Sequence, residues 1–127
     1  MCKTCKTCFS KGTLVRNGKK LVAIEKIESV IESITNSIAE IHFGKHCINV
    51  TPNHLVKVKG KGYVQVSQLE VGCELETVNG GSVVMDTFVC IKSIDMEEKV
   101  YTLDMGGSDI VVSEKAVLFA DYTTMKA

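Results

Sequence analysis

Short apolar runs separated by glycine-containing turns make up much of this chain. Runs rich in valine, isoleucine and leucine flank four such turns, at Asn17-Gly18, 60–62, 79–81 and 106–107. Asparagine–glycine and closely spaced glycines are typical of β-hairpin connections, because these residues tolerate the backbone angles of tight turns. β-branched residues in the flanking runs fit a pleated, half-buried sheet. The pattern predicts an all-β protein built from hairpins.

One segment of the chain fits two structures. Six isoleucines recur at spacings of three and four residues, at positions 24, 27, 31, 34, 38 and 41. This spacing alone is typical of an amphipathic helix. Isoleucine is β-branched and stiff at χ1, which favours a strand instead, and Asn36 suits a turn. The spacing by itself leaves both structures open.

The composition indicates one small domain. The chain has 127 residues, of which 45% are hydrophobic and one is proline, and its formal net charge is zero. A chain of this length buries a single core. It has no basic excess for nucleic acid or an anionic membrane, and no apolar run approaches the roughly 20 residues that cross a bilayer. We expect a monomer with no nucleic-acid partner, no membrane span and no cofactor.

Three side chains have the chemistry to cut a neighbouring peptide bond. Cys8 supplies a thiol, and Thr51 and His54 supply a hydroxyl and an imidazole within one short segment. A peptide bond is held planar by resonance, with a rotation barrier of roughly 18–20 kcal/mol, so attack by a thiol needs help from a site. An imidazole, with an unperturbed pKa of about 6.5, can accept and donate a proton near neutral pH. A threonine three residues before a histidine is nevertheless a common spacing, and alone it is not specific.

The wider context of these residues is more specific. Four segments resemble, in order, the motif blocks of Hint domains, which are the self-processing modules of inteins and of Hedgehog proteins. The segments are residues 8–15, 50–58, 100–104 and 117–122. The resemblance implies an all-β, horseshoe-like fold of hairpins whose N- and C-terminal segments are adjacent at the active site. It also implies a Hint domain over residues 8–122, with flanks at 1–7 and 123–127.

The same resemblance bears on the isoleucine segment and on the kind of Hint domain. It predicts strands there, with a turn near Thr35-Asn36-Ser37, and not a long helix. The stretch around His54 and the ending 120–122 resemble the Hedgehog autoprocessing domain more than a splicing intein. Only six residues follow Asp121, so we do not expect this chain to carry the sterol-presenting region of Hedgehog proteins.

The resemblance assigns roles to individual residues. Cys8 matches the nucleophile that opens the domain, and Thr51 and His54 match the pair that activates the scissile peptide. In this reading the Cys8 sulfur attacks the Thr7 carbonyl and converts the Thr7-Cys8 amide into a thioester by an N-to-S acyl shift. Water, a thiol or another nucleophile then cleaves the thioester. The substrate is a polypeptide fused in cis at the N-terminus, and each molecule reacts once.

The C-terminal segment departs from the splicing pattern. Splicing inteins usually end in His-Asn followed by Cys, Ser or Thr, where this chain has Ala120, Asp121 and Tyr122. Asparagine cyclisation therefore lacks its amide nucleophile, and we do not expect full splicing. Asp121 is a candidate catalytic carboxylate that would accept a proton from water or an alcohol. The alternative is that Asp121 caps a turn near the end of the chain.

The N-terminal cysteines open a competing possibility. Cys2, Cys5 and Cys8 have a spacing that resembles half of a zinc or iron–sulfur site, with His42, His46 or Cys47 as a fourth ligand. No second Cys-x-x-Cys pair follows, so we expect no metal here; a disulfide among these cysteines is the alternative. A metal-binding module therefore remains one alternative to self-processing. C-terminal cleavage at Asp121 and a non-catalytic Hint-fold module are the others.

Overall fold

The computed structural model describes residues 8–43, 46–78, 82–84 and 90–126, and in these residues it is almost entirely β. The strands are β1 (Phe9–Ser10), β2 (Leu14–Asn17), β3 (Lys20–Ala23), β4 (Ile31–Phe43), β5 (His46–Val50), β6 (Leu55–Val58), β7 (Gly62–Gln65), β8 (Glu74–Glu76), β9 (Ser82–Val84), β10 (Cys90–Thr102), β11 (Ile110–Val112) and β12 (Val117–Phe119). Short helical turns are η1 (Ile24–Lys26), η2 (Val66–Gln68) and α1 (Tyr122–Lys126). No helix in the described residues is both long and apolar enough to span a membrane.

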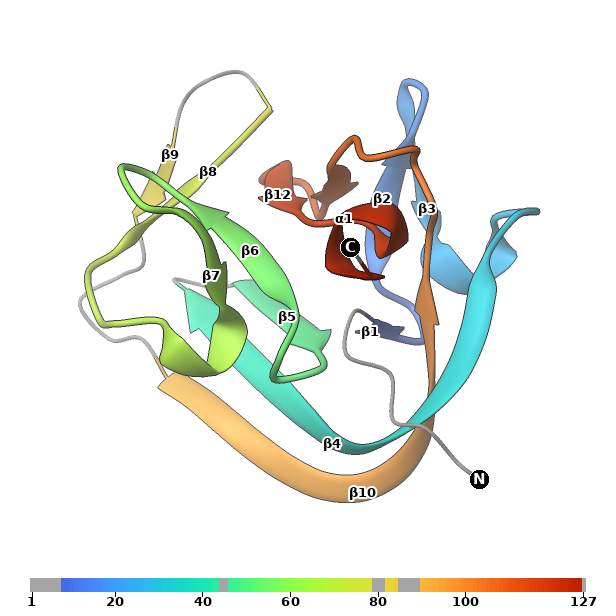
Figure 1. The fold of residues 1–127 in the computed structure, drawn as a ribbon, viewed down its shortest axis with the longest axis horizontal. Coiled ribbons are helices and arrows are strands. Elements are labelled where there is room, and N and C mark those ends of the chain that lie inside the picture. The colour runs from blue at the N-terminus through green and yellow to red at the C-terminus, as the bar shows by residue number, and fades with distance from the viewer. Residues whose placement is uncertain (1–7, 44–45, 79–81, 85–89, 127) are drawn as a thin grey trace.

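Two sheets make up the fold. The first is closed, in the order β1-β10-β4-β5, because β1 pairs with both β10 and β5. Its long strands β4 and β10 lie side by side as a curved ribbon around the base of the molecule (Figure 1). The second sheet has the order β3-β2-β11-β12-β6-β8-β9, with β7 paired to β6. The predicted all-β, horseshoe-like fold is confirmed.

One buried core is shared by residues of both sheets. Inward positions of β4 and β5 contribute Ile41, Phe43 and Ile48, and Phe119 and Leu75 come from the second sheet. These residues alternate with more exposed neighbours along their strands, as expected for a sheet with one buried face. Phe9 of β1 belongs to the same cluster, so the residue after Cys8 is anchored in the core.

The isoleucine segment is a strand, and its predicted turn is wrong. β4 runs without interruption through Thr35-Asn36-Ser37. The irregularity lies in the partner strand, since Ser37 pairs with Asp95 and Thr35 pairs with Glu98. Two residues of β10 therefore face one residue of β4, which is the arrangement of a β-bulge and bends the ribbon. The asparagine that suits a turn lies at this bulge.

The glycine turns give a mixed outcome. β2 and β3 pair across Asn17-Gly18, and β6 and β7 pair across the 60–62 turn, so these two hairpins are confirmed. Gly18 has a φ of 68° and Gly60 a φ of 82°, which glycine adopts without a steric penalty. β8 and β9 also pair, although residues 79–81 between them lie outside the described residues. The hairpin predicted at Gly106-Gly107 is wrong, because β11 pairs with β2 and β12 and not with β10.

Candidate functional site

Cys8 and Thr51 lie opposite each other at the point where β1 meets β5. Cys8 precedes β1 and Thr51 follows β5, and the pairing of Phe9 with Val50 brings the two residues together. The amide nitrogen of Cys8 donates a hydrogen bond to Thr51 Oγ1 over 3.3 Å. In return the amide nitrogen of Thr51 donates to the Cys8 carbonyl oxygen over 2.9 Å. Both residues are buried, so Cys8 is held from both sides of its backbone.

His54 reaches the same place through a tight turn. The His54 amide donates to the Thr51 carbonyl over 3.1 Å, which closes the turn after β5. The imidazole is fully buried between two aromatic rings. Its centroid lies 4.6 Å from that of Phe9 and 5.3 Å from that of Phe119. These rings exclude water and fix the position of the imidazole.

The surroundings of His54 decide its protonation state. Burial lowers the pKa of the imidazole to about 4, although the carbonyl of Ala120 and the backbone of Cys8 favour the protonated ring. The ring is therefore neutral at pH 7. Nε2 lies 2.8 Å from the Ala120 carbonyl oxygen, and a carbonyl can only accept, so Nε2 carries the proton.

Within the described residues, the other ring nitrogen of His54 has no hydrogen-bond partner. Nδ1 is buried and unpaired, and in this tautomer it presents a lone pair. Buried polar atoms without partners are rare and costly, and they often mark a functional position. Nδ1 is thus a buried hydrogen-bond acceptor without a partner among the described residues.

The C-terminal segment meets the N-terminal segment at this site. The Ala120 amide donates to the Leu55 carbonyl over 2.9 Å, directly after β12 pairs with β6. The Ala120 carbonyl oxygen then accepts a hydrogen bond from Nε2 of His54. His54 therefore contacts both the segment that follows β12, through Ala120, and β1, through Phe9. The predicted adjacency of the two terminal segments is confirmed.

Asp121 makes a different set of contacts from the other predicted site residues. Its Oδ2 accepts hydrogen bonds from the amides of Met105, at 2.7 Å, and Gly107, at 2.9 Å. Its Oδ1 accepts from the amide of Thr124 at 2.8 Å, which caps α1. Burial alone would raise the pKa of Asp121, but the hydrogen bonds from Thr124, Gly107 and Met105 lower it. These contacts support the capping alternative for Asp121.

Cys8 is disulfide-bonded in this structure. The thiolate, and not a disulfide sulfur, is the nucleophile in cysteine chemistry. A role for Cys8 as a nucleophile would therefore require that this disulfide be reduced. The proposed metal cluster of Cys2, Cys5 and Cys8 involves residues 1–7, which lie outside the described residues.

The surroundings of His54 are not evident from the sequence. Phe9 and Phe119 read as ordinary core positions in short apolar runs, and only their place beside Cys8 and Ala120 hinted at the site. The Ala120 carbonyl could not be found from residue type, because every residue has a carbonyl.

Known structures resemble this chain over nearly its whole length, although its sequence matches no family model and no curated protein. An intein-like domain from Clostridium thermocellum is 23% identical, with a TM-score of 0.78, and the match covers 91% of this chain and 99% of that one. The AceL NrdHF class 3 split intein is 16% identical, with a TM-score of 0.68 and coverages of 90% and 96%. The DnaB intein from Synechocystis sp. PCC 6803 is 13% identical, with a TM-score of 0.59 and coverages of 90% and 97%.

These similarities concern inteins and an intein-like domain, at identities that establish a fold and not an activity. The expected closeness to the Hedgehog autoprocessing domain stays a prediction. Strand order, the meeting of the terminal segments and the structural matches agree with one another. This chain therefore has the Hint fold, the fold of inteins and intein-like domains.

Proposed function

We propose that this chain is a self-processing domain that cleaves the peptide bond between Thr7 and Cys8 through an internal thioester. Its substrate is a polypeptide joined in cis at the N-terminus, and each molecule reacts once. Two features of one site support the proposal together. The Cys8 amide is held by a hydrogen bond to Thr51 Oγ1 over 3.3 Å, and His54 supplies a buried, neutral imidazole. The amide nitrogen of Cys8 is the leaving atom of the reaction.

The proposed reaction moves one proton and exchanges one bond. The Cys8 sulfur forms a bond to the carbonyl carbon of Thr7, and the bond from that carbon to the Cys8 nitrogen breaks. The thiol proton passes to Nδ1 of His54 and from there to the departing nitrogen, which becomes an amine. A neutral imidazole whose Nδ1 has no partner among the described residues suits this relay, because it can accept a proton before it donates one.

Thr51 has a positioning role in this proposal. Its hydroxyl accepts the Cys8 N–H, and its own amide holds the Cys8 carbonyl. The two bonds fix the orientation of the scissile nitrogen and leave the imidazole to supply the proton. Fixed geometry of this kind lowers the entropic cost of reaching the transition state.

We propose that the reaction stops at the N-terminal junction. Both carboxylate oxygens of Asp121 are engaged by backbone amides, so this side chain is not poised to attack its own peptide bond. The proposal accordingly gives Asp121 a structural part and no catalytic one. Water or an external thiol resolves the thioester.

Because Cys8 is disulfide-bonded, the proposed cleavage can be started by adding a reductant. A folded protein fused ahead of Met1 would be purified under oxidising conditions and then treated with a phosphine reductant, with or without dithiothreitol. The phosphine reduces the disulfide but does not cleave a thioester, whereas dithiothreitol does both. We expect slow release of the fused protein with phosphine alone and fast release when dithiothreitol is added.

The variants make this test specific. Cys8→Ala is expected to abolish release under both conditions. Cys73→Ser is the matched control, because Cys73 is a partly buried cysteine elsewhere in the fold. Release in Cys8→Ala, or no release from the reduced wild type, would contradict the proposal.

A further inference from the structure

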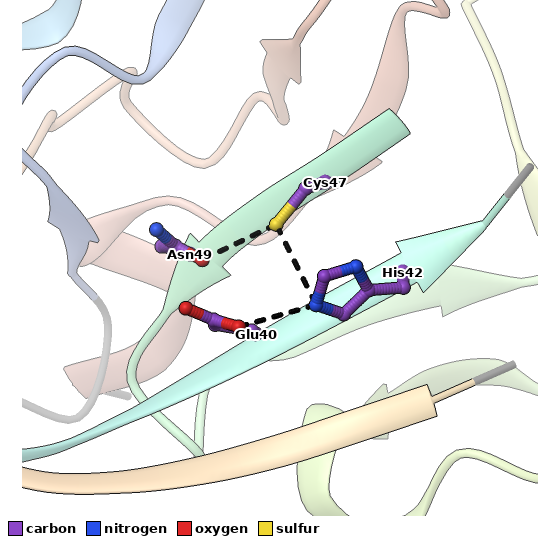
Figure 2. A network of polar contacts seen from close by, with 4 residues as sticks. All are labelled: Glu40, His42, Cys47 and Asn49. Atoms are coloured by element: carbon purple, nitrogen blue, oxygen red, sulfur yellow. Dashed lines mark hydrogen bonds and ion pairs between the residues drawn. The ribbon is translucent and has the colours of Figure 1, made fainter. Parts of the chain in front are cut away.

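Four polar side chains form a compact group on the hairpin of β4 and β5, on the opposite face of these strands from the core (Figure 2). His42 pairs directly with Cys47, and Glu40 pairs directly with Asn49. The residues between them, Ile41 on β4 and Ile48 on β5, point into the core. Because side chains alternate along a strand, the four polar residues share the other face. Their positions are thus set by the register of the sheet.

The atoms of this group lie at distances suited to a shared metal ion. Nε2 of His42 is 3.2 Å from Oε1 of Glu40 and 4.0 Å from Sγ of Cys47. One ligand atom from each of the three residues falls within 4.8 Å of the others. Zinc binds sulfur at about 2.3 Å and nitrogen or oxygen at about 2.0–2.2 Å, which places neighbouring ligands about 3–4 Å apart. Small side-chain rotations would bring all three onto one ion.

We propose that Glu40, His42 and Cys47 form a binding site for a divalent transition-metal ion, and that Zn²⁺ is the ion it suits best. A mixed set of one carboxylate, one imidazole and one thiolate matches the borderline character of zinc. Three protein ligands leave a fourth position for water or for Oδ1 of Asn49, which lies 3.5 Å from the Cys47 sulfur. Binding displaces the thiol proton of Cys47 into solvent.

The surroundings give the ion access. Cys47 is exposed, and it also lines a surface cavity of about 310 Å³ bounded by residues 12–14 and 112–114. Lys92 of β10 lies opposite Glu40 in the sheet and opposes cation binding by its charge. We therefore expect Glu40 to be the weakest of the three ligands. His46 is not part of the site, because its ring stacks on Phe43 at a centroid distance of 5.7 Å.

This site differs from the N-terminal cysteine cluster considered from the sequence. In that cluster, His42, His46 or Cys47 would be the fourth ligand beside Cys2, Cys5 and Cys8. The structure places His42 and Cys47 together with Glu40 on the paired strands β4 and β5. An ion bound there would tie β4 to β5, the strand that leads directly into Thr51.

The test must separate this site from the other cysteines. We would use the full chain with Cys2, Cys5, Cys8 and Cys90 replaced by serine, which leaves Cys47 and Cys73 as the thiols. Cobalt is a spectroscopic substitute for zinc, because a thiolate ligand adds a charge-transfer band. Titration with Co²⁺ in a phosphine reductant, followed by Zn²⁺ competition, is expected to show one equivalent of bound metal with that band.

The variants assign the ligands. Cys47→Ser and His42→Ala should weaken binding by at least the roughly 100-fold that loss of an outer-shell partner alone can cause. Glu40→Gln should weaken it less, and Cys73→Ser should leave it unchanged. Absence of bound metal in the four-serine chain, or unchanged binding in both Cys47→Ser and His42→Ala, would overturn the proposal.

A second measurement covers the case in which the four-serine chain does not fold. In the chain with its other cysteines intact, zinc would be added and counted after gel filtration. Cys47→Ser should retain one equivalent less zinc than Cys73→Ser. Equal zinc content in these two variants would also overturn the proposal.

Discussion

At the scale of single residues, His54 and Thr51 make unequal contributions to the proposed chemistry. His54 handles the proton, and a general acid–base residue is worth about 10²–10⁴-fold in rate. Thr51 accepts a neutral hydrogen bond from the Cys8 amide, and such a bond contributes about 0.5–1.5 kcal/mol. The imidazole of His54 should therefore contribute more to the cleavage rate than the Thr51 hydroxyl, although both side chains are buried.

The first prediction concerns the imidazole. His54→Ala should slow cleavage at Thr7-Cys8 by about 10²–10⁴-fold, because the proposed reaction uses its imidazole to carry the proton to the Cys8 nitrogen. The rate of release of a fused protein, followed on gels under reducing conditions, measures this effect. His46→Ala removes a histidine outside the site and should leave the rate unchanged. A His54→Ala rate within a factor of a few of wild type would argue against the relay.

The second prediction concerns the hydroxyl. Thr51→Ala should slow the same reaction by up to about 10-fold, as expected for the loss of one neutral hydrogen bond. Thr51→Ser keeps the oxygen and should retain most of the rate. Equal loss in the serine and alanine variants would show that packing of the methyl group, and not the hydrogen bond to Cys8, is what matters.

The third prediction follows from the protonation of His54. The pKa of its imidazole is about 4 in the folded protein and near 6.5 in an unfolded chain. Between these values the unfolded state binds more protons, so the stability is fully present above pH 6.5 and is lost as the pH falls towards 4. The loss from this group amounts to about 3 kcal/mol.

Urea unfolding between pH 4.5 and pH 7.5 measures that dependence. His54→Gln lacks the titrating group and should show a flatter dependence of unfolding free energy on pH than the wild type. The comparison uses slopes, so a lower overall stability of the variant does not affect it. Identical slopes would mean that the imidazole is not buried in the neutral form.

At the scale of elements, Asp121 joins two parts of the chain. Its carboxylate binds the loop between β10 and β11 through Met105 and Gly107, and it caps α1 through Thr124. The loop is held by this side chain and not by a hairpin ladder. Asp121 therefore fixes the segment that follows Ala120, whose carbonyl orients His54.

The fourth prediction tests that role. Asp121→Ala should lower the free energy of unfolding by about 2–4 kcal/mol, since it removes a helix cap and leaves loop amides unpaired. Asp121→Asn keeps one acceptor oxygen and should cost about half as much. Denaturant unfolding gives these values. If Asp121→Asn instead kept full stability but blocked resolution of the thioester, the catalytic role considered from the sequence would be right.

Sequence patterns predicted the elements unevenly, for physical reasons. The hairpins at Asn17-Gly18 and 60–62 were predictable because local turn chemistry alone determines them. The 106–107 turn has similar chemistry, but the strands around it find their partners elsewhere in the chain. In β4 the break expected near Asn36 is absorbed by a bulge in β10. Pairing between strands that are distant in sequence cannot be predicted from the local composition of either strand.

At the scale of the whole molecule, the topology brings together residues that are far apart in sequence. β1 joins β5, and β12 joins β6, so Cys8, His54 and Ala120 converge although up to 112 positions separate them. Cys8, Thr51 and His54 could be predicted as site residues from the sequence, because they lie in segments that resemble motif blocks of Hint domains. The burial of His54 between Phe9 and Phe119, and its contact with the Ala120 carbonyl, could not be predicted, because they depend on packing and backbone position.

The most direct test of this account is intact mass spectrometry of a protein fused ahead of Met1, after reduction and incubation with dithiothreitol. The account predicts a released fragment that ends at Thr7 and carries dithiothreitol as a thioester, together with a partner that begins at Cys8. Neither product should form in Cys8→Ala. An intact fusion after full reduction of Cys8, or a cut at any other bond, would contradict the claim that Cys8 forms an internal thioester.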